Sequence, residues 1–174
     1  MGWIVKNSAT MEVPRRDEPY LNEELKQQLE HEAVQWYPTR RAAIMPTLHA
    51  IQERYGWIPY QALEETAAFL NISFAEAMDT VTFYEEYFLH PKGKYVIWVC
   101  QSIACELLNH TSLLEHCKEK LNIEVGETTE DGRFTLMTVE CLGSCGTAPV
   151  ALVNEKLHEN LTVQNLDSIL DSLE

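Results

Sequence analysis

The chain has 174 residues, of which 27 are Asp or Glu and 13 are Lys or Arg, so its formal net charge is −14. This acid excess disfavours binding to nucleic acid or to an anionic membrane surface, because both need clustered cations. Hydrophobic residues make up 45% of the chain, which is enough for a buried core, and no apolar run approaches the roughly 20 residues that span a bilayer. We therefore expect one or two globular domains without direct membrane insertion.

The first half of the sequence predicts an arm followed by helices. Residues 1–20 show no periodicity and begin without the basic and apolar regions of a signal peptide. Apolar residues then recur at helical spacing in segments that cover about 21–37, 44–55, 63–70 and 73–87. Gly56 is typical of a helix end, and Ser73 with Glu76 has the pattern of a capping box. We predict a helical bundle over residues 21–93, in which the aromatic residues 83, 84, 87 and 88 pack in the core or between domains and do not line a cofactor pocket.

The second half, residues 94–174, predicts a sheet covered by helices. It begins after Pro91-Lys92-Gly93, where aromatic and β-branched residues become frequent. The pattern predicts strands near 94–99, 134–139, 149–153 and 156–158, and helices over 107–121 and about 162–173. This order of elements favours an α+β or α/β fold with helices packed on a sheet.

Four of the five cysteines form two pairs, Cys100 with Cys105 and Cys141 with Cys145. Each pair follows one of the predicted strands 94–99 and 134–139. If these strands are neighbours that run in the same direction, the loops after them bring four thiols together. Four thiolates are the ligand set of a [2Fe–2S] cluster, a [4Fe–4S] cluster or a structural zinc ion. The fifth residue, Cys117, lies on the apolar face of its predicted helix, and we expect a buried structural thiol there.

The spacing within the pairs favours an iron–sulfur cluster. Neither pair has the Cys-x-x-Cys gap of zinc knuckles and of thioredoxin-type redox motifs. The run of closely spaced cysteines that typifies bacterial [4Fe–4S] sites is also missing from the sequence. Two separated pairs suit a binuclear cluster, while zinc and a disulfide or thiol redox pair remain open alternatives. We expect His90, His110 and His116 to lie on surfaces rather than to bind metal.

The cysteine pattern resembles that of a known family. Its motifs are Cys100-x4-Cys105, Glu140-Cys141-Leu142-Gly143-Ser144-Cys145 and Ala148-Pro149. Similar segments occur at Gly126–Leu136, Leu48-His49-x-x-Gln52, Gly56-Trp57-Ile58-Pro59 and Thr82-Phe83-Tyr84. Together they resemble the thioredoxin-like [2Fe–2S] ferredoxin family, which includes the 24 kDa subunit of respiratory NADH:quinone oxidoreductase (complex I). The resemblance covers about residues 21 to 173.

The resemblance implies a thioredoxin-like domain over residues 94–174 that holds one [2Fe–2S] cluster, preceded by the helical bundle. It implies that the ligands are Cys100, Cys105, Cys141 and Cys145. It also implies an electron-transfer subunit of an NADH dehydrogenase, whose cluster exchanges single electrons with the FMN of a partner subunit that binds NADH. We then expect no catalytic residue on this chain and a docking role for the helical part. The Ala148–Pro149 bond is expected to be cis, because thioredoxin-like folds have a cis-proline at that place.

The sequence agrees with a cofactor-binding partner, because it contains no G-x-G-x-x-G motif and no P-loop. We expect a cytoplasmic protein that is peripheral to the inner face of the membrane as part of a complex, in preference to one of the mitochondrial matrix. Two alternatives remain open at this point. One is the equivalent diaphorase subunit of an NAD-linked hydrogenase or formate dehydrogenase, and the other is a docking module with structural zinc.

Overall fold

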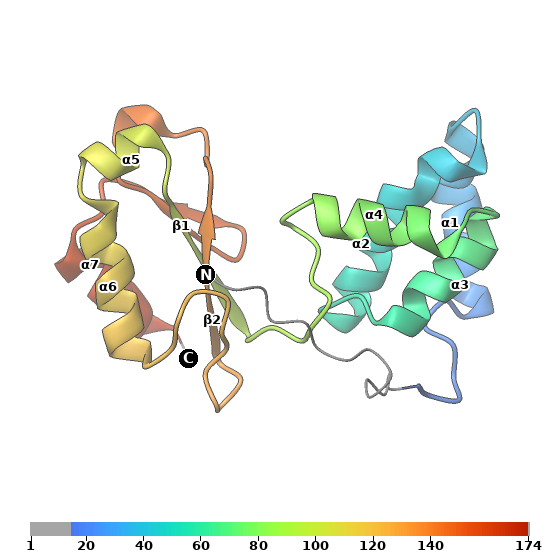
Figure 1. The fold of residues 1–174 in the computed structure, drawn as a ribbon, viewed down its shortest axis with the longest axis horizontal. Coiled ribbons are helices and arrows are strands. Elements are labelled where there is room, and N and C mark those ends of the chain that lie inside the picture. Colours follow the sequence, from blue (N-terminus) through green and yellow to red (C-terminus); the bar gives the residue numbers. More distant parts are fainter. Residues whose placement is uncertain (1–14, 174) are drawn as a thin grey trace, which may run out of the picture. The chain divides into compact units, whose positions relative to one another are not determined.

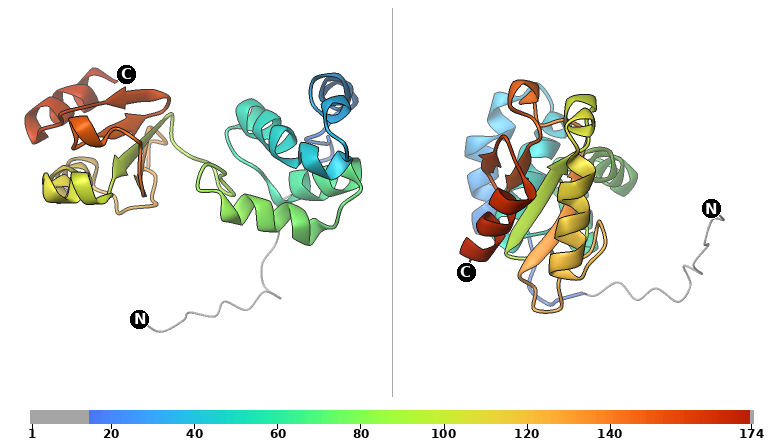
Figure 2. Two further views of the ribbon diagram at one scale, coloured as in Figure 1. Left: turned by 90° about the horizontal axis from the view of Figure 1, so that it is seen from above. Right: turned by 90° about the vertical axis from the view of Figure 1, so that its left-hand side faces the viewer.

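The computed structural model describes residues 15–173 and divides into two compact units. The first unit ends at Pro91 and is helical, and the second begins at Lys92 and contains the sheet (Figures 1 and 2). Most of the predicted arm, residues 1–14, lies outside the described residues. At its described end, Arg15 pairs with Glu64 at 2.8 Å, so this end of the arm is tied to the first unit.

Four α-helices form the described part of the first unit. They are α1 (Glu23–Glu32), α2 (Ile44–Tyr55), α3 (Tyr60–Leu70) and α4 (Phe74–Phe83), and two short 3₁₀ helices, Val34–Trp36 and Arg40–Ala43, lie between α1 and α2. Gly56 ends α2 with a φ of 79°, a left-handed conformation that glycine adopts without strain. The capping box of Ser73 and Glu76 is present at the start of α4, as predicted.

Helix α4 ends at Phe83, earlier than the predicted end near Tyr87. The following segment satisfies its backbone groups elsewhere, because the Phe88 carbonyl accepts from Ile58 N at 2.7 Å and the Phe88 N–H donates to Gln52 Oε1 at 2.8 Å. This pairing replaces the hydrogen bonds that a longer helix would have made.

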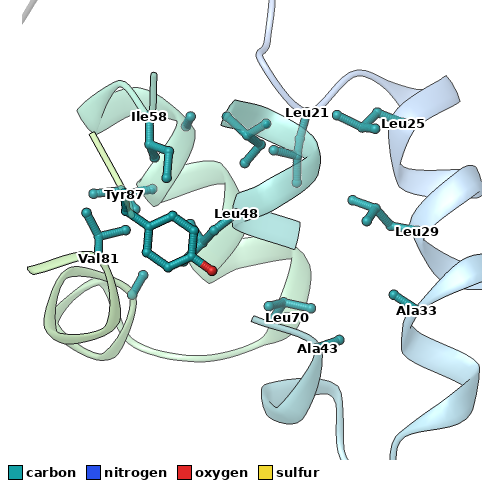
Figure 3. Close-up of a cluster of buried hydrophobic side chains, with 14 of the residues drawn as sticks. Leu21, Leu25, Leu29, Ala33, Ala43, Leu48, Ile58, Leu70, Val81 and Tyr87 are labelled. Carbon is teal, nitrogen blue, oxygen red and sulfur yellow. The ribbon is translucent and has the colours of Figure 1, made fainter. Parts of the chain in front are cut away.

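The core of the first unit contains side chains from all four helices and the segment after α4 (Figure 3). Its fully buried members include Leu21, Leu48, Ile51, Ile58, Leu63 and Leu70. Tyr87 is buried as predicted, and its hydroxyl donates to the Met45 carbonyl at 3.3 Å. Phe83 and Tyr84 are 78% and 41% exposed, so they are not core residues, and the packing between domains that was also expected for them stays a prediction. They lie at the end of α4, where Phe83 is the last helical residue and Tyr84 is the C-cap.

The second unit has a mixed sheet whose described strands follow the order β2-β1-β3-β4. The strands are β1 (Tyr95–Cys100), β2 (Phe134–Val139), β3 (Ala151–Val153) and β4 (Lys156–His158). Strand β1 is parallel to β2 and antiparallel to β3, and β3 is antiparallel to β4. This unit together with the helical one gives the α+β architecture that the sequence predicts.

Three helices accompany the described strands, α5 (Ile103–Leu107), α6 (His110–Leu121) and α7 (Val163–Ser172). The single helix predicted over 107–121 is therefore wrong at its start. Asn109 adopts a left-handed conformation with a φ of 68°, which separates the short α5 from α6. None of the helices between residues 15 and 173 has the length and apolar character that crossing a bilayer requires.

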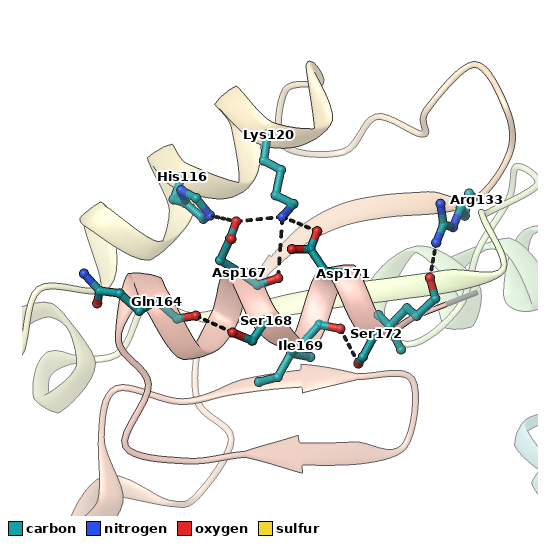
Figure 4. Close-up of polar contacts among 10 residues, drawn as sticks. His116, Lys120, Arg133, Gln164, Asp167, Ser168, Ile169, Asp171 and Ser172 are labelled. Atoms are coloured by element: carbon teal, nitrogen blue, oxygen red, sulfur yellow. Dashed lines mark hydrogen bonds and ion pairs between the residues drawn. The ribbon is translucent and has the colours of Figure 1, made fainter.

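Helices α6 and α7 pack beside each other on the sheet (Figure 4). Their apolar side chains meet those of the strands in one core, which includes Ile97, Val99, Leu113, Leu136, Leu166 and Leu170. On the outer side, Asp167 accepts from Lys120 Nζ at 2.7 Å and lies 2.8 Å from His116 Nε2. The pKa of Asp167 is lowered, first by Lys120 and then by His116. His116 is thus half-buried, with its side chain 23% exposed, and pairs with Asp167 on the outer side of the two helices.

Candidate metal centre

Both cysteine pairs start from the same edge of the sheet. The parallel register of β1 and β2 places Cys100 opposite Val139, two residues before Cys141. The pairing continues past the strands, since Gln101 N donates to the Val139 carbonyl at 2.9 Å. The sequence-based expectation that these strands are parallel neighbours is confirmed. Because the carboxyl ends of parallel strands meet at one edge, the segments that follow them begin side by side.

The first cysteine segment, residues 100–108, buries its thiols. Cys100 is the last residue of β1 and Cys105 lies inside α5, and each is 2% exposed. Both pack against Val150. Burial raises the pKa of Cys105, with smaller contributions in the same direction from Cys100 and Cys145, while a backbone hydrogen bond of Val150 acts in the opposite sense. The segment is therefore anchored by apolar packing.

The second cysteine segment, residues 141–147, leaves its thiols exposed. Gly143 has a φ of 74° and its N–H donates to Cys141 Sγ at 3.3 Å. This hydrogen bond lowers the pKa of Cys141, because it stabilises the thiolate. Cys145 begins a 3₁₀ helix (Cys145–Thr147), and a thiolate at Cys141 raises the pKa of Cys145 by repulsion. The Gly143 donor therefore favours negative sulfur at Cys141.

The two segments bring their thiols into one neighbourhood. Ser102, in the first segment, is a minor cause of the lowered pKa of Cys141 in the second, after the Gly143 N–H. Cys105 interacts electrostatically with Cys145, and Cys145 interacts with Cys100. The five cysteines all lie in the described part of the chain and are free thiols. The remaining one, Cys117, is fully buried in the core of the second unit, where burial raises its pKa to about 12, and its predicted structural role is confirmed.

A polar network that the sequence did not reveal supports the second segment. Glu159 Oε1 accepts from Ser144 Oγ at 2.7 Å and from Thr147 Oγ1 at 2.5 Å. The pKa of Glu159 is lowered, first by Thr147 and then by Ser144. A sequence offers no signal for these contacts, because they join residues that are 12 and 15 positions apart and no common element carries them. The Ala148–Pro149 bond that follows is cis, as expected.

The donor set fits an iron–sulfur cluster. Thiolates are soft ligands that suit iron–sulfur clusters and zinc. Within residues 15–173, no group of three or more His, Cys, Asp or Glu side chains is placed to hold a metal ion. A binuclear cluster places two thiolates on each iron, and two cysteine pairs on two segments match that division. The exposed amide of Gly143 adds a hydrogen bond to sulfur of the kind that tunes such centres.

Comparisons with known proteins agree with this chemistry. The family model for the thioredoxin-like [2Fe–2S] ferredoxin matches residues 30–174. An E-type NADH-quinone oxidoreductase subunit of Rhizobium meliloti is 42% identical over 136 residues, which cover 78% of this chain and 81% of the relative. NADH-quinone oxidoreductase subunit 2 of Thermus thermophilus is 40% identical over 151 residues, which cover 85% of this chain and 83% of the relative.

A solved structure shares the fold. In an air-oxidised NAD⁺-reducing [NiFe]-hydrogenase, one chain matches with a TM-score of 0.63 and 24% identity. The match covers 73% of this chain and 22% of the hydrogenase chain. This likeness concerns the fold, and the sequence relatives carry the functional comparison.

Proposed function

The chain belongs to the thioredoxin-like [2Fe–2S] ferredoxin family, and from this premise we propose that Cys100, Cys105, Cys141 and Cys145 are the ligands of its [2Fe–2S] cluster. The chain is an electron-transfer subunit of an NADH:quinone oxidoreductase and assembles with other subunits. When bound, the cluster supplies reversible one-electron chemistry. The observation that carries the ligand assignment is the meeting of two cysteine segments at the common edge of β1 and β2.

Each segment contributes differently to holding the cluster. The first keeps Cys100 and Cys105 buried against Val150, which excludes water from that side of the site. The second presents Cys141 and Cys145 at the surface, with the Gly143 N–H directed at sulfur. Burial and hydrogen bonds to sulfur are two of the means by which a protein sets the reduction potential of such a cluster.

The partner that we propose is the flavin- and NADH-binding subunit of the same complex. The first cysteine segment exposes large apolar side chains beside Cys105, namely Ile103 at 73%, Leu107 at 80% and Leu108 at 54%. We call this group the α5 patch. Contiguous exposed apolar residues mark protein interaction sites, and a partner seated here lies next to a proposed ligand. FMN and NADH then belong to the partner, and this chain needs no active site of its own.

The two parts of the chain divide this work in our proposal. Residues 94–174 hold the cluster, and the helical part, residues 21–93, is a docking element that binds other subunits. Its exposed aromatic side chains, among them Trp36 at 75% and Phe83 at 78%, support a docking role. In the complex the protein is peripheral and lies on the cytoplasmic, inner face of the membrane. The subunits that copurify with the chain distinguish this setting from a hydrogenase or a formate dehydrogenase.

The test is metal and sulfide analysis with EPR on anaerobically purified protein, before and after dithionite. We expect two irons and two sulfides, and a rhombic signal that is present only after reduction. Serine at any of the four proposed ligands removes this signal or changes its g values, because an oxygen replaces a thiolate sulfur. Cys117→Ala is the matched control and retains it, because Cys117 is in the core. A colourless protein with one zinc ion overturns the proposal, as does a full signal in the Cys145→Ser variant.

A further inference from the structure

The turn that carries Cys145 is held by a carboxylate from another part of the chain. Ser144 directly precedes Cys145 and Thr147 follows it by two residues, and both hydroxyls donate to Glu159 Oε1, at 2.7 and 2.5 Å. We propose that Glu159 is a positioning residue that fixes this turn, slows the loss of the cluster and lowers its reduction potential. The inference rests on the proposed ligand set, in which Cys145 binds the cluster.

The contacts close the turn on both sides of Cys145. The Thr147 N–H donates to the Ser144 carbonyl at 3.1 Å, and the two hydroxyl oxygens lie 2.7 Å apart. Each hydroxyl has one proton, and an ionised carboxylate only accepts, so Glu159 satisfies both donors at once. Removing the carboxylate leaves the two hydroxyls with each other, with water and, for Thr147 Oγ1, with the Ser144 carbonyl at 3.2 Å. The turn then keeps its backbone hydrogen bond but loses the carboxylate that joins the Ser144 and Thr147 side chains to another part of the chain.

The backbone next to Glu159 is held in place by hydrogen bonds. The next two residues pair with the segment after the turn, since Asn160 N donates to the Thr147 carbonyl at 2.7 Å and Leu161 N donates to the Pro149 carbonyl at 2.9 Å. The Leu161 side chain is 5% exposed and belongs to the core under the sheet. The tie thus connects the Cys145 turn to the hydrophobic core of the unit.

The second cysteine segment needs such a tie more than the first. Cys100 and Cys105 are held by burial, whereas Cys141 and Cys145 are exposed. Hydrogen bonds to an ionised acceptor are about twice as strong as neutral ones, so a carboxylate is a suitable clamp for an exposed turn. The same carboxylate places a fixed negative charge beside a ligand. Adding an electron near this charge costs Coulomb energy, which favours the oxidised state.

Three variants of the full-length protein separate the effect of the Glu159 hydrogen bonds on the turn from the effect of its negative charge on the reduction potential. In Glu159→Ala, we expect iron release to a chelator to become severalfold faster and the EPR line shape to change, because the turn is loosened. In Glu159→Gln, the amide oxygen still accepts from the hydroxyls, so iron release stays near the wild-type rate. The reduction potential of the cluster becomes more positive, because the negative charge is gone. Glu155→Gln is the matched control, since Glu155 is an exposed acid in the β3–β4 turn, and it leaves release and EPR line shape unchanged.

The result that overturns the inference is a Glu159→Ala protein with the wild-type release rate, EPR line shape and potential. If Glu159→Ala does not fold, as judged by circular dichroism, the Glu159→Gln variant decides, and a potential equal to that of the wild type and of Glu155→Gln overturns the inference. Failure of the ligand assignment gives a different result, because Cys145→Ser then retains the wild-type EPR signal.

Discussion

The two cysteine segments begin at the same sheet edge but hold their thiols by opposite means. Residues 100–108 bury Cys100 and Cys105 to 2% exposure and turn the apolar α5 patch outward. Residues 141–147 leave both thiols exposed, with the Gly143 N–H donating to Cys141 Sγ and Glu159 accepting from the Ser144 and Thr147 hydroxyls. One half of the site is therefore set by apolar packing and the other half by hydrogen bonds.

The difference follows from what each strand leads into. After β1, the chain enters α5, and this helix carries Cys105 back against Val150. After β2, Gly143 turns the chain through a left-handed conformation with no neighbour within 4 Å of the place where a Cβ would be, so the segment stays at the surface. The first cysteine segment is suited to anchoring its thiols and to docking a partner subunit. The second is suited to setting the reduction potential of the cluster, because hydrogen bonds and nearby charges act directly on sulfur.

The largest expected effect concerns binding of the partner subunit at the first cysteine segment. Leu107→Ser removes the most exposed apolar side chain of the α5 patch. Burial of a leucine is worth about 1.5–3 kcal/mol, so binding of the flavin-containing subunit should weaken roughly tenfold or more. The measurement is titration of the purified partner against the cluster-loaded protein.

The control for this docking prediction is Leu157→Ser, which changes an exposed leucine on β4 that is outside the α5 patch. It should leave the dissociation constant unchanged, and both variants should retain the EPR signal. Equal weakening by the two variants would contradict docking through the α5 patch.

The next prediction compares how a buried and an exposed cysteine contribute to the free energy of unfolding of the cluster-free protein. Cys105→Ser places a hydroxyl in a buried apolar site beside Val150, and an unsatisfied buried polar group costs about 1–3 kcal/mol. Cys141→Ser changes an exposed side chain and should shift the free energy of unfolding by no more than about 0.5 kcal/mol. Urea unfolding of both apo-proteins under reducing conditions checks this. A similar loss for both would show that burial does not distinguish the segments once the cluster is removed.

Local sequence patterns predicted the parts of this site that local structure controls. The β-branched runs identified β1 and β2, and a cysteine pair after each run predicted where the thiols meet. Ser73 and Gly56 marked helix ends because caps are decided by a few adjacent residues. The ligand assignment itself remains a prediction that the Cys→Ser variants test.

The features that the sequence did not predict depend on distant contacts or on one backbone angle. Asn109 splits the expected helix through a left-handed conformation that many asparagines do not adopt. Phe83 and Tyr84 have the composition of core residues, and their exposure depends on where α4 stops. The bonds of Glu159 to Ser144 and Thr147 arise only after the chain has returned through β3 and β4.

The smallest expected effect is the pH dependence of stability that comes from Cys117, a buried cysteine that is not a proposed ligand. Its pKa in the folded protein is raised to about 12 from an ordinary value of 9.0, because burial disfavours the thiolate. Above this ordinary value the unfolded chain loses the proton while the folded protein keeps it, so stability falls as the pH rises from about 9 towards about 12. At about pH 10 the loss relative to neutral pH should be about 1.4 kcal/mol.

Cys117→Ala removes this contribution, so the difference in unfolding free energy between wild type and variant should shrink by that amount between about pH 8 and about pH 10. Tyr87, whose pKa burial also raises to about 12, is present in both proteins and cancels in the comparison. Urea unfolding of the reduced apo-proteins at the two pH values measures the difference. A constant difference would mean that the Cys117 thiol ionises as easily inside the protein as outside. In that case burial alone would not keep a cysteine protonated in this unit, and the contrast between the buried and the exposed ligands would need another cause.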